Sequence, residues 1–112
     1  MAAVYVNNLV INSGSDFSQT FTLEGSDNNS PLNLNNYEVD AQMRKWSGST
    51  GVTTFTSSVV NSQTGQIRIS LGSSITSSLK PGRYVYDVLL TNNTSTTRVV
   101  EGMALVREGV TR

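Results

Sequence analysis

The residues that could carry out chemistry are few, and the types that most often do so are missing. The 112-residue chain has no histidine and no cysteine. Without them there is no Ser-His or Cys-His arrangement, no thiolate nucleophile, no cysteine-based metal site and no disulfide framework. What remains is a set of carboxylates that stand singly along the chain, at Asp16, Glu24, Asp27, Glu38, Asp40, Asp87, Glu101 and Glu108. A glycosidase would need two of them facing each other across a cleft, which a small domain without inserted loops rarely builds. We therefore expect no enzyme activity and no catalytic residues.

A polar stretch at residues 27–30 combines Asp27 with two asparagines and a serine. Their oxygen atoms are of the kind that bind Ca²⁺, so a weak site is conceivable. A solvated turn whose Asp and Asn side chains bond the nearby backbone is the favoured interpretation. We expect no metal and no cofactor.

The charge balance limits the partners. Eight basic and eight acidic side chains cancel, and charged residues make up only 14% of the chain. Binding to nucleic acid or to anionic membranes needs net positive charge, so neither is an expected partner. The apolar runs are too short to span a membrane. The first residues, Met1 to Ala3, lack the basic and apolar regions of a signal peptide, so we expect synthesis and folding in a reducing cytoplasm.

Short alternating segments separated by turn residues dominate the chain. Serine, threonine and asparagine make up 40 of the 112 residues, and these types favour strands and turns over helices. Strands are expected at residues 4–11 with a kink at 7–8, 17–24, 37–46, 53–60, 67–71, 83–90 and 96–106, with one helical turn at 73–79. About seven strands with turns about every 8 to 12 residues predict an all-β fold. We expect a single antiparallel Ig-like β-sandwich domain over residues 1–112, with short extended N- and C-terminal arms.

A tight turn precedes the most strand-like segment. Pro81 and Gly82 suit the two central positions of a type II turn, the second of which requires a positive φ. A preceding Leu79 and a following Tyr84 complete the pattern of the Tyr corner of Ig-like sandwiches. There the tyrosine ring packs on the core edge and its hydroxyl bonds the backbone a few residues upstream. We expect this structural role for Tyr84, and ligand stacking is the alternative.

The order of several short motifs along nearly the whole chain resembles that of a known group. They lie at residues 13–17 (SGSDF), 31–37 (PLNLNNY), 43–45 (MRK), 64–67 (TGQI), 79–88 (LKPGRYVYDV) and 100–106 (VEGMALV). This order resembles that of small Ig-like β-sandwich domains in the virion proteins of tailed phages. It is similar both to the N-terminal domain of phage baseplate upper proteins and to short structural proteins of T4-like cyanophages. The resemblance implies a part of a virion and supplies no catalytic residues.

The outward positions of three expected strands carry residue types found at protein interfaces. The alternation at residues 83–90 points Val85, Asp87 and Leu89 away from the core. The predicted contact face consists of Arg44, Trp46, Val85, Asp87, Leu89, Glu101 and Met103, with Val99 and Leu105 in the same expected phase. Contiguous apolar patches usually mark interfaces, and Trp and Arg are enriched at hot spots. The alternative is that both faces are covered within the protein and that a cross-strand Arg44–Asp87 pair is purely structural.

The sequence thus predicts a non-enzymatic structural protein of a phage virion, present in multiple symmetric copies that bind other virion proteins. We expect a capsid decoration or cement protein on the major capsid protein, with a baseplate, neck or tail adaptor as the alternative. A carbohydrate- or host-surface-binding module is a further alternative, in which Trp46 or Tyr37 would stack on the sugar. The arms at residues 1–6 and 107–112 either add a strand to a neighbour's sheet or fray.

Overall fold

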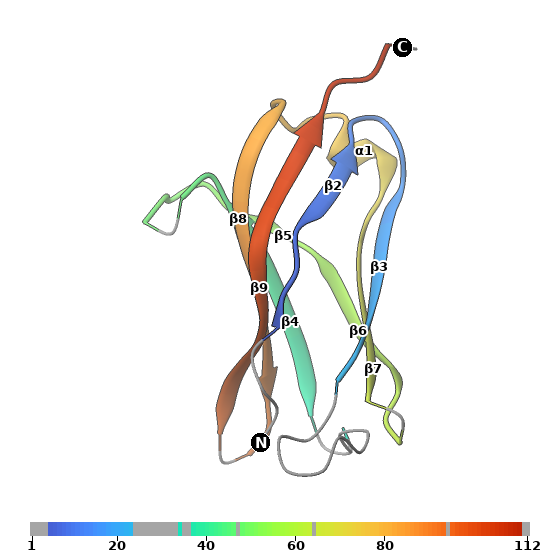
Figure 1. The fold of residues 1–112 in the computed structure, drawn as a ribbon, viewed down its shortest axis with the longest axis vertical. Helices are drawn as coiled ribbons and strands as arrows, with labels where there is room; N and C mark the ends of the chain where they lie inside the picture. Colours follow the sequence, from blue (N-terminus) through green and yellow to red (C-terminus); the bar gives the residue numbers. More distant parts are fainter. Residues whose placement is uncertain are drawn as a thin grey trace.

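The computed structural model describes residues 5–23, 34, 37–46, 48–63, 65–93 and 95–110, and shows the predicted all-β sandwich (Figure 1). Its elements are β1 (Tyr5–Val6), β2 (Leu9–Asn12), β3 (Phe17–Thr22), β4 (Glu38–Arg44), β5 (Thr53–Thr54), β6 (Thr56–Asn61), β7 (Gln66–Leu71), α1 (Ser73–Thr76), β8 (Gly82–Thr91) and β9 (Thr96–Arg107). Within these residues no helix is long and apolar enough to cross a membrane. The expected polar turn at residues 25–31, with its oxygen cluster at 27–30, lies outside the described residues.

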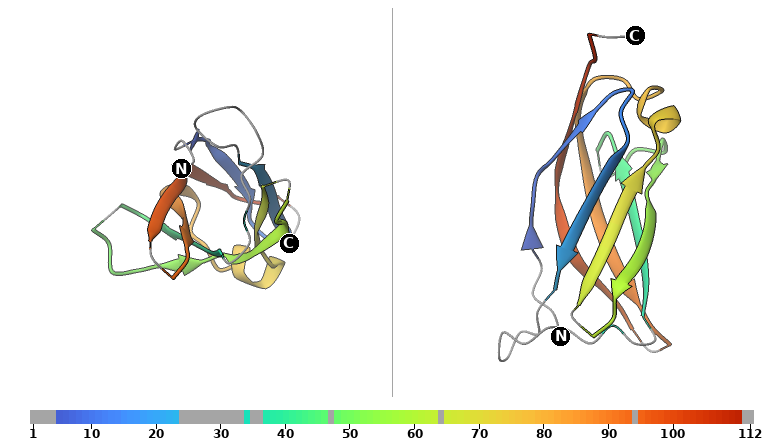
Figure 2. Two further views of the ribbon diagram at one scale, coloured as in Figure 1. Left: turned by 90° about the horizontal axis from the view of Figure 1, so that it is seen from below. Right: turned by 90° about the vertical axis from the view of Figure 1, so that its right-hand side faces the viewer.

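The two sheets face each other across one core (Figure 2). One has the order β1/β2–β9–β8–β4–β5, and the other has the order β3–β7–β6. Most pairs are antiparallel, as expected, but β1 and β2 both run parallel to β9. The prediction of a purely antiparallel fold is wrong at this edge, because alternation shows which side of a strand is buried and not which strand it pairs with.

Alternation along the strands fills the space between the sheets. Ile67 and Ile69 of β7 face Val88 of β8 from the opposite sheet, and all three are fully buried. Burying a side chain of this size contributes about 1.5–3 kcal/mol, so the core supplies most of the stabilising free energy. The expected inward direction of Tyr86, Val88 and Leu90 is confirmed.

The expected strand at residues 53–60 is in fact two strands in different sheets. Thr53–Thr54 pairs with β4, whereas Thr56–Asn61 pairs with β7. Phe55 makes the crossing: its amide donates to the carbonyl of Ala41, and its ring is buried against Phe17 and Tyr86. An aromatic residue at the crossing ties the two sheets together along this side.

The kink expected at Asn7 and Asn8 separates β1 from β2, where the chain passes very close to β9. A Cβ atom added to Gly102 would lie 2.2 Å from the Asn7 carbonyl oxygen, so only glycine fits there. The Asn8 side chain accepts a hydrogen bond from the Met103 amide (3.1 Å), and the buried Tyr86 hydroxyl donates to the Asn7 carbonyl (2.5 Å). Burial raises the pKa of Tyr86 to about 12. Residues 5–6 are therefore part of the sheet and not of a free arm, while residues 1–4 and 111–112 lie outside the described residues.

The corner before β8 is held by side-chain to backbone bonds. The hydroxyl of Tyr84 donates to the Lys80 carbonyl (2.7 Å), which is the bond that a Tyr corner requires. Gly82 has a φ of 140°, a conformation that favours glycine.

The expected helical turn forms as α1. The hydroxyl of its buried Thr76 donates a hydrogen bond to the Ser15 carbonyl (2.9 Å) and accepts one from the Gly14 amide (3.1 Å). The Tyr84 bond therefore holds the start of β8, the central strand of the candidate site, and the Thr76 bonds hold α1 against the turn before β3.

Candidate functional site

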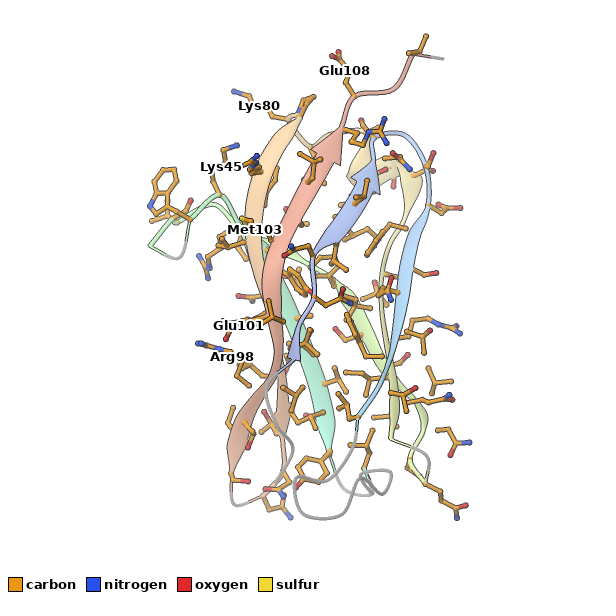
Figure 3. All side chains as sticks on the ribbon, viewed as in Figure 1. Lys45, Lys80, Arg98, Glu101, Met103 and Glu108 are labelled. Atoms are coloured by element: carbon orange, nitrogen blue, oxygen red, sulfur yellow. The ribbon has the colours of Figure 1, made fainter. Side chains whose placement is uncertain are left out.

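The outward side chains of β4, β8 and β9 form a mixed apolar and charged surface, called here the β4–β8–β9 face. The strand register places Arg44, Val85 and Met103 in one row across it. The next rows are Gln42–Asp87–Glu101 and Asp40–Leu89–Arg98. Figure 3 shows Met103, Glu101 and Arg98 following one another along β9.

An open groove of about 680 Å³ lies on this face. It is lined by Gln42, Arg44, Trp46, Val85, Tyr86, Asp87, Leu89, Arg98, Glu101 and Gly102. Six of the seven residues predicted for the contact face thus lie around one depression, and Met103 neighbours it on β9. The sequence pattern did not assign Arg98 to this face. The outward direction of its side chain depends on a bulge in β9, which the alternation of apolar and polar residues does not reveal.

That bulge also corrects the expected phase of β9. Val88 pairs with Val100 and Leu89 pairs with Arg98, so Val99 is the extra residue between them. Both Val99 and Val100 are fully buried, and the prediction that Val99 points outward is wrong. Beyond the bulge Glu101, Met103 and Leu105 do point outward.

Arg98 bridges two carboxylates in the groove. Its Nε lies 3.4 Å from Asp87 Oδ2, and its Nη1 lies 3.6 Å from Glu101 Oε1. The Arg44–Asp87 pair of the structural alternative is not formed, since Arg44 stands opposite Val85 and Asp87 stands opposite Gln42. Cross-strand pairs at the surface contribute little to stability, so this arrangement shapes the surface more than it holds the fold.

Arg44 instead fixes the β4–β5 hairpin. Its Nη1 donates to the Ser49 carbonyl (2.6 Å) and its Nη2 donates to Gln42 Oε1 (3.3 Å). The hairpin projects away from the body of the sandwich (Figures 1 and 2). Trp46, which is 62% exposed, lies in this hairpin and forms one wall of the groove. A tethered hairpin therefore presents a large aromatic side chain at the edge of the face.

The apolar part of the face extends beyond the groove onto β1 and β2. Leu105 stands opposite Val10, and Val6 stands opposite Glu101. Val6, Val10, Met103 and Leu105 are exposed by 75%, 51%, 47% and 41%. The sequence alone did not assign Val6 and Val10 to this face, because their parallel pairing with β9 was not foreseen.

The outer surface of the other sheet, called the β3–β7–β6 face, is different in kind. Its outward residues are Ser18, Thr20, Thr22, Thr56, Ser58, Val60, Gln66, Arg68 and Ser70. Arg68 donates to the Thr20 hydroxyl (3.4 Å), and the rest are mainly small hydroxyl side chains. Nothing among these residues resembles an apolar contact surface.

Within the described part of the chain, no group of three His, Cys, Asp or Glu residues could hold a metal ion. Tyr37, the second aromatic proposed for sugar stacking, packs against the core, and its neighbours at 35–36 lie outside the described residues. What the groove offers chemically is an indole face beside guanidinium, amide and carboxylate groups. Such a set binds polar surfaces or ligands through hydrogen bonds and stacking.

The topology and this surface define an all-β sandwich in which one outer face differs chemically from the other. No protein-family model matches the chain, and no match was found among curated proteins. Among solved structures it is similar to InlP of Listeria monocytogenes, with a TM-score of 0.51 and 18% identity over 90% of this chain and 26% of InlP. A family 123 glycoside hydrolase from Clostridium perfringens gives a TM-score of 0.47 and 13% identity, over 96% of this chain and 24% of that protein. The chain thus spans about a quarter of each, and the likeness to InlP is one of fold alone.

Proposed function

We propose that the chain is a non-enzymatic structural protein of a tailed-phage virion, and that it binds other virion proteins through the β4–β8–β9 face. The observation that carries the contact role is the difference between the two outer faces. One exposes Trp46 in the wall of a groove and four further apolar side chains on the strands beside it, whereas the other exposes mainly hydroxyls. Contiguous exposed apolar surface is typical of interfaces. The virion location rests on the order of motifs in the sequence.

Within the virion, a capsid decoration or cement protein is the favoured role, and a baseplate, neck or tail adaptor is the alternative. Lattice-wide binding repeats one contact many times, so a modest affinity per copy suffices. Quantitative mass spectrometry of purified particles separates the two roles. A copy number comparable to that of the major capsid protein supports decoration, and about 6 to 18 copies support a ring on the tail axis. Absence from the particle would overturn the virion proposal.

The contact role has its own test in particles that lack the protein. Purified wild-type protein should bind them, and the Trp46→Ala variant should bind at least about tenfold more weakly, because aromatic anchors dominate interfaces. The Val60→Ala variant is the matched control, since Val60 is an exposed apolar residue on the β3–β7–β6 face. Equal loss in both variants would contradict the assignment of the face.

The groove favours one second candidate, a carbohydrate-binding module. An exposed indole beside Gln42, Arg44 and Asp87 is a suitable surface for a sugar ring, whose C–H face stacks on an aromatic while its hydroxyls bond polar groups. A glycan array would distinguish the two candidates. Binding that is lost in a folded Trp46→Ala variant would favour sugar recognition, and a silent array would favour assembly.

A further inference from the structure

Charge is segregated along the strands of the β4–β8–β9 face. Toward the α1 end, the outward charged residues are Arg44, Arg83 and Arg107. Toward the turn between β8 and β9, they are Glu38, Asp40, Asp87, Glu101 and Arg98. Because Arg98 offsets one of the four carboxylates, these strand residues carry three positive charges toward one end and a net three negative charges toward the other. The apolar pair Val85–Met103 lies at the boundary between the two ends, in the same row as Arg44.

Most of these charges have no ionic partner in the described part of the chain. Arg44 bonds only neutral acceptors, and the side chains of Arg83 and Arg107 make no hydrogen bond or ion pair there. Glu38 and Asp40 are exposed and equally free of partners among the described residues. The face therefore presents unused positive charge at one end and unused negative charge at the other.

Such a face is complementary to a copy of itself in one orientation. A two-fold axis that lies in the interface, perpendicular to the strands, sets the α1 end of one copy against the acidic end of the other. When this axis lies between the Val85–Met103 row and the Asp87–Glu101 row, these two rows face each other across the interface, and Arg83 lies over the row of the second copy that contains Asp40. A two-fold axis along the strands would set like charges together, which costs free energy.

We propose that the β4–β8–β9 face binds a second copy of this chain, with the strands of the two copies running in opposite directions. This inference rests on the proposed contact role of the face, and it makes a second copy of the chain one of the proteins that the face binds. A face about four strands wide and about eight residues long covers roughly 500 Å². Two such faces bury roughly 1,000 Å², the lower limit for a specific interface, so the dimer is weak, with a dissociation constant roughly micromolar or higher.

Sedimentation equilibrium of the purified protein from about 10 μM to about 1 mM tests the proposal. Wild-type protein should form dimers that weaken as salt is added. Arg83→Glu and Asp40→Arg should each weaken dimerisation by roughly tenfold or more, because each places two like-charge contacts in one symmetric interface. Arg68→Glu is the control, since it makes the same charge change on the β3–β7–β6 face and should leave the dimer intact.

Mixing the two weakened variants gives the sharpest result. In a mixed pair, Glu at position 83 of one copy faces Arg at position 40 of the other, while the remaining contact keeps its native Asp40 and Arg83. The mixture should therefore dimerise nearly as well as the wild type, although each variant alone does not. Melting curves of all variants should match, which confirms that folding is intact.

A protein that stays monomeric at about 1 mM would overturn the proposal. A dimer that is insensitive to Arg83→Glu, or as sensitive to Arg68→Glu, would also overturn it, as would failure of the mixture to recover. These outcomes are separate from the virion proposal. If the protein is monomeric in solution but present in particles, only the dimer proposal is overturned. If it dimerises but is absent from particles, only the virion proposal is overturned.

Discussion

The two outer faces of this sandwich are built on the same alternation and yet differ completely in chemistry. The described outward residues of the β3–β7–β6 face are mainly small hydroxyl side chains, with Val60, Gln66 and Arg68 among them. The β4–β8–β9 face carries Trp46, Met103 and Leu105 beside a groove and a set of charges ordered along the strands. Folding requires only that the inward positions be apolar. Several exposed apolar residues gathered on one face, against the single exposed Val60 among the described outward residues of the other, therefore indicate selection for contact and not for stability.

The largest effect should come from the crossing that extends the contact face onto β1 and β2. Gly102→Val would drive a Cβ into the Asn7 carbonyl, so β1 and β2 would separate from β9. We expect a loss of about 3 kcal/mol in the free energy of unfolding, measured with urea. Gly51→Ala is the control, because the nearest atom to its added Cβ is 3.8 Å away. An unchanged midpoint for Gly102→Val would show that the close approach is not needed.

The same crossing should make stability depend on pH. The pKa of Tyr86 is raised from 10.0 to about 12 by burial, so the folded state favours the neutral hydroxyl. Its contribution is complete below pH 10 and is lost as the pH rises toward about 12. Urea unfolding across this range should show that loss in the wild type and a weaker pH dependence in Tyr86→Phe. At neutral pH the variant should lose about 1 kcal/mol, through the missing bond to Asn7. Identical pH profiles would contradict this account.

A smaller effect is expected at the corner that positions β8. Tyr84→Phe removes the hydroxyl that donates to the Lys80 carbonyl and keeps the ring under the Lys45 ammonium. Because the bond is exposed, we expect a loss of about 0.5–1 kcal/mol at neutral pH. Thermal melting monitored by circular dichroism provides the measurement. No loss at all would mean that the hydroxyl has no role in the corner.

The smallest effects on stability are expected for a pair of substitutions that compare the two outer faces directly. Met103→Thr and Val60→Thr replace exposed apolar side chains on opposite faces, so each should change stability by less than about 0.5 kcal/mol. Only Met103→Thr should weaken dimerisation, by several-fold, because Met103 lies in the row nearest the two-fold axis. Sedimentation of both variants at equal concentration tests this prediction. Similar weakening of the dimer in both variants would contradict the assignment of the contact to the β4–β8–β9 face.

Much of the contact face could be predicted from local pattern. Residues 83–90 alternate so regularly that the outward direction of Val85, Asp87 and Leu89 followed directly. The Tyr84 bond was also expected, because the turn residues before it have few conformational choices.

The remainder depends on tertiary pairing that no local pattern encodes. Val99 and Val100 are both apolar, so the sequence did not show where the bulge reverses the phase of β9. The residue opposite Arg44 depends on the register between β4 and β8, which are far apart in the sequence, and the Asp87 of the structural alternative lies one row away. The parallel pairing of β1 and β2 added Val6 and Val10 to the face without any signal in their spacing.

If the proposed contact role is right, the β4–β8–β9 face is covered in the assembled state and the β3–β7–β6 face is not. Because the chain has no cysteine, single thiols can report on each face: Leu105→Cys on one and Ser58→Cys on the other. The measurement is the rate of thiol labelling in purified particles relative to the dilute isolated protein. We expect labelling of the Leu105→Cys variant to slow by roughly tenfold or more on assembly, with the Ser58→Cys variant unchanged. Equal rates in both states for Leu105→Cys, or protection of Ser58→Cys alone, would contradict the account.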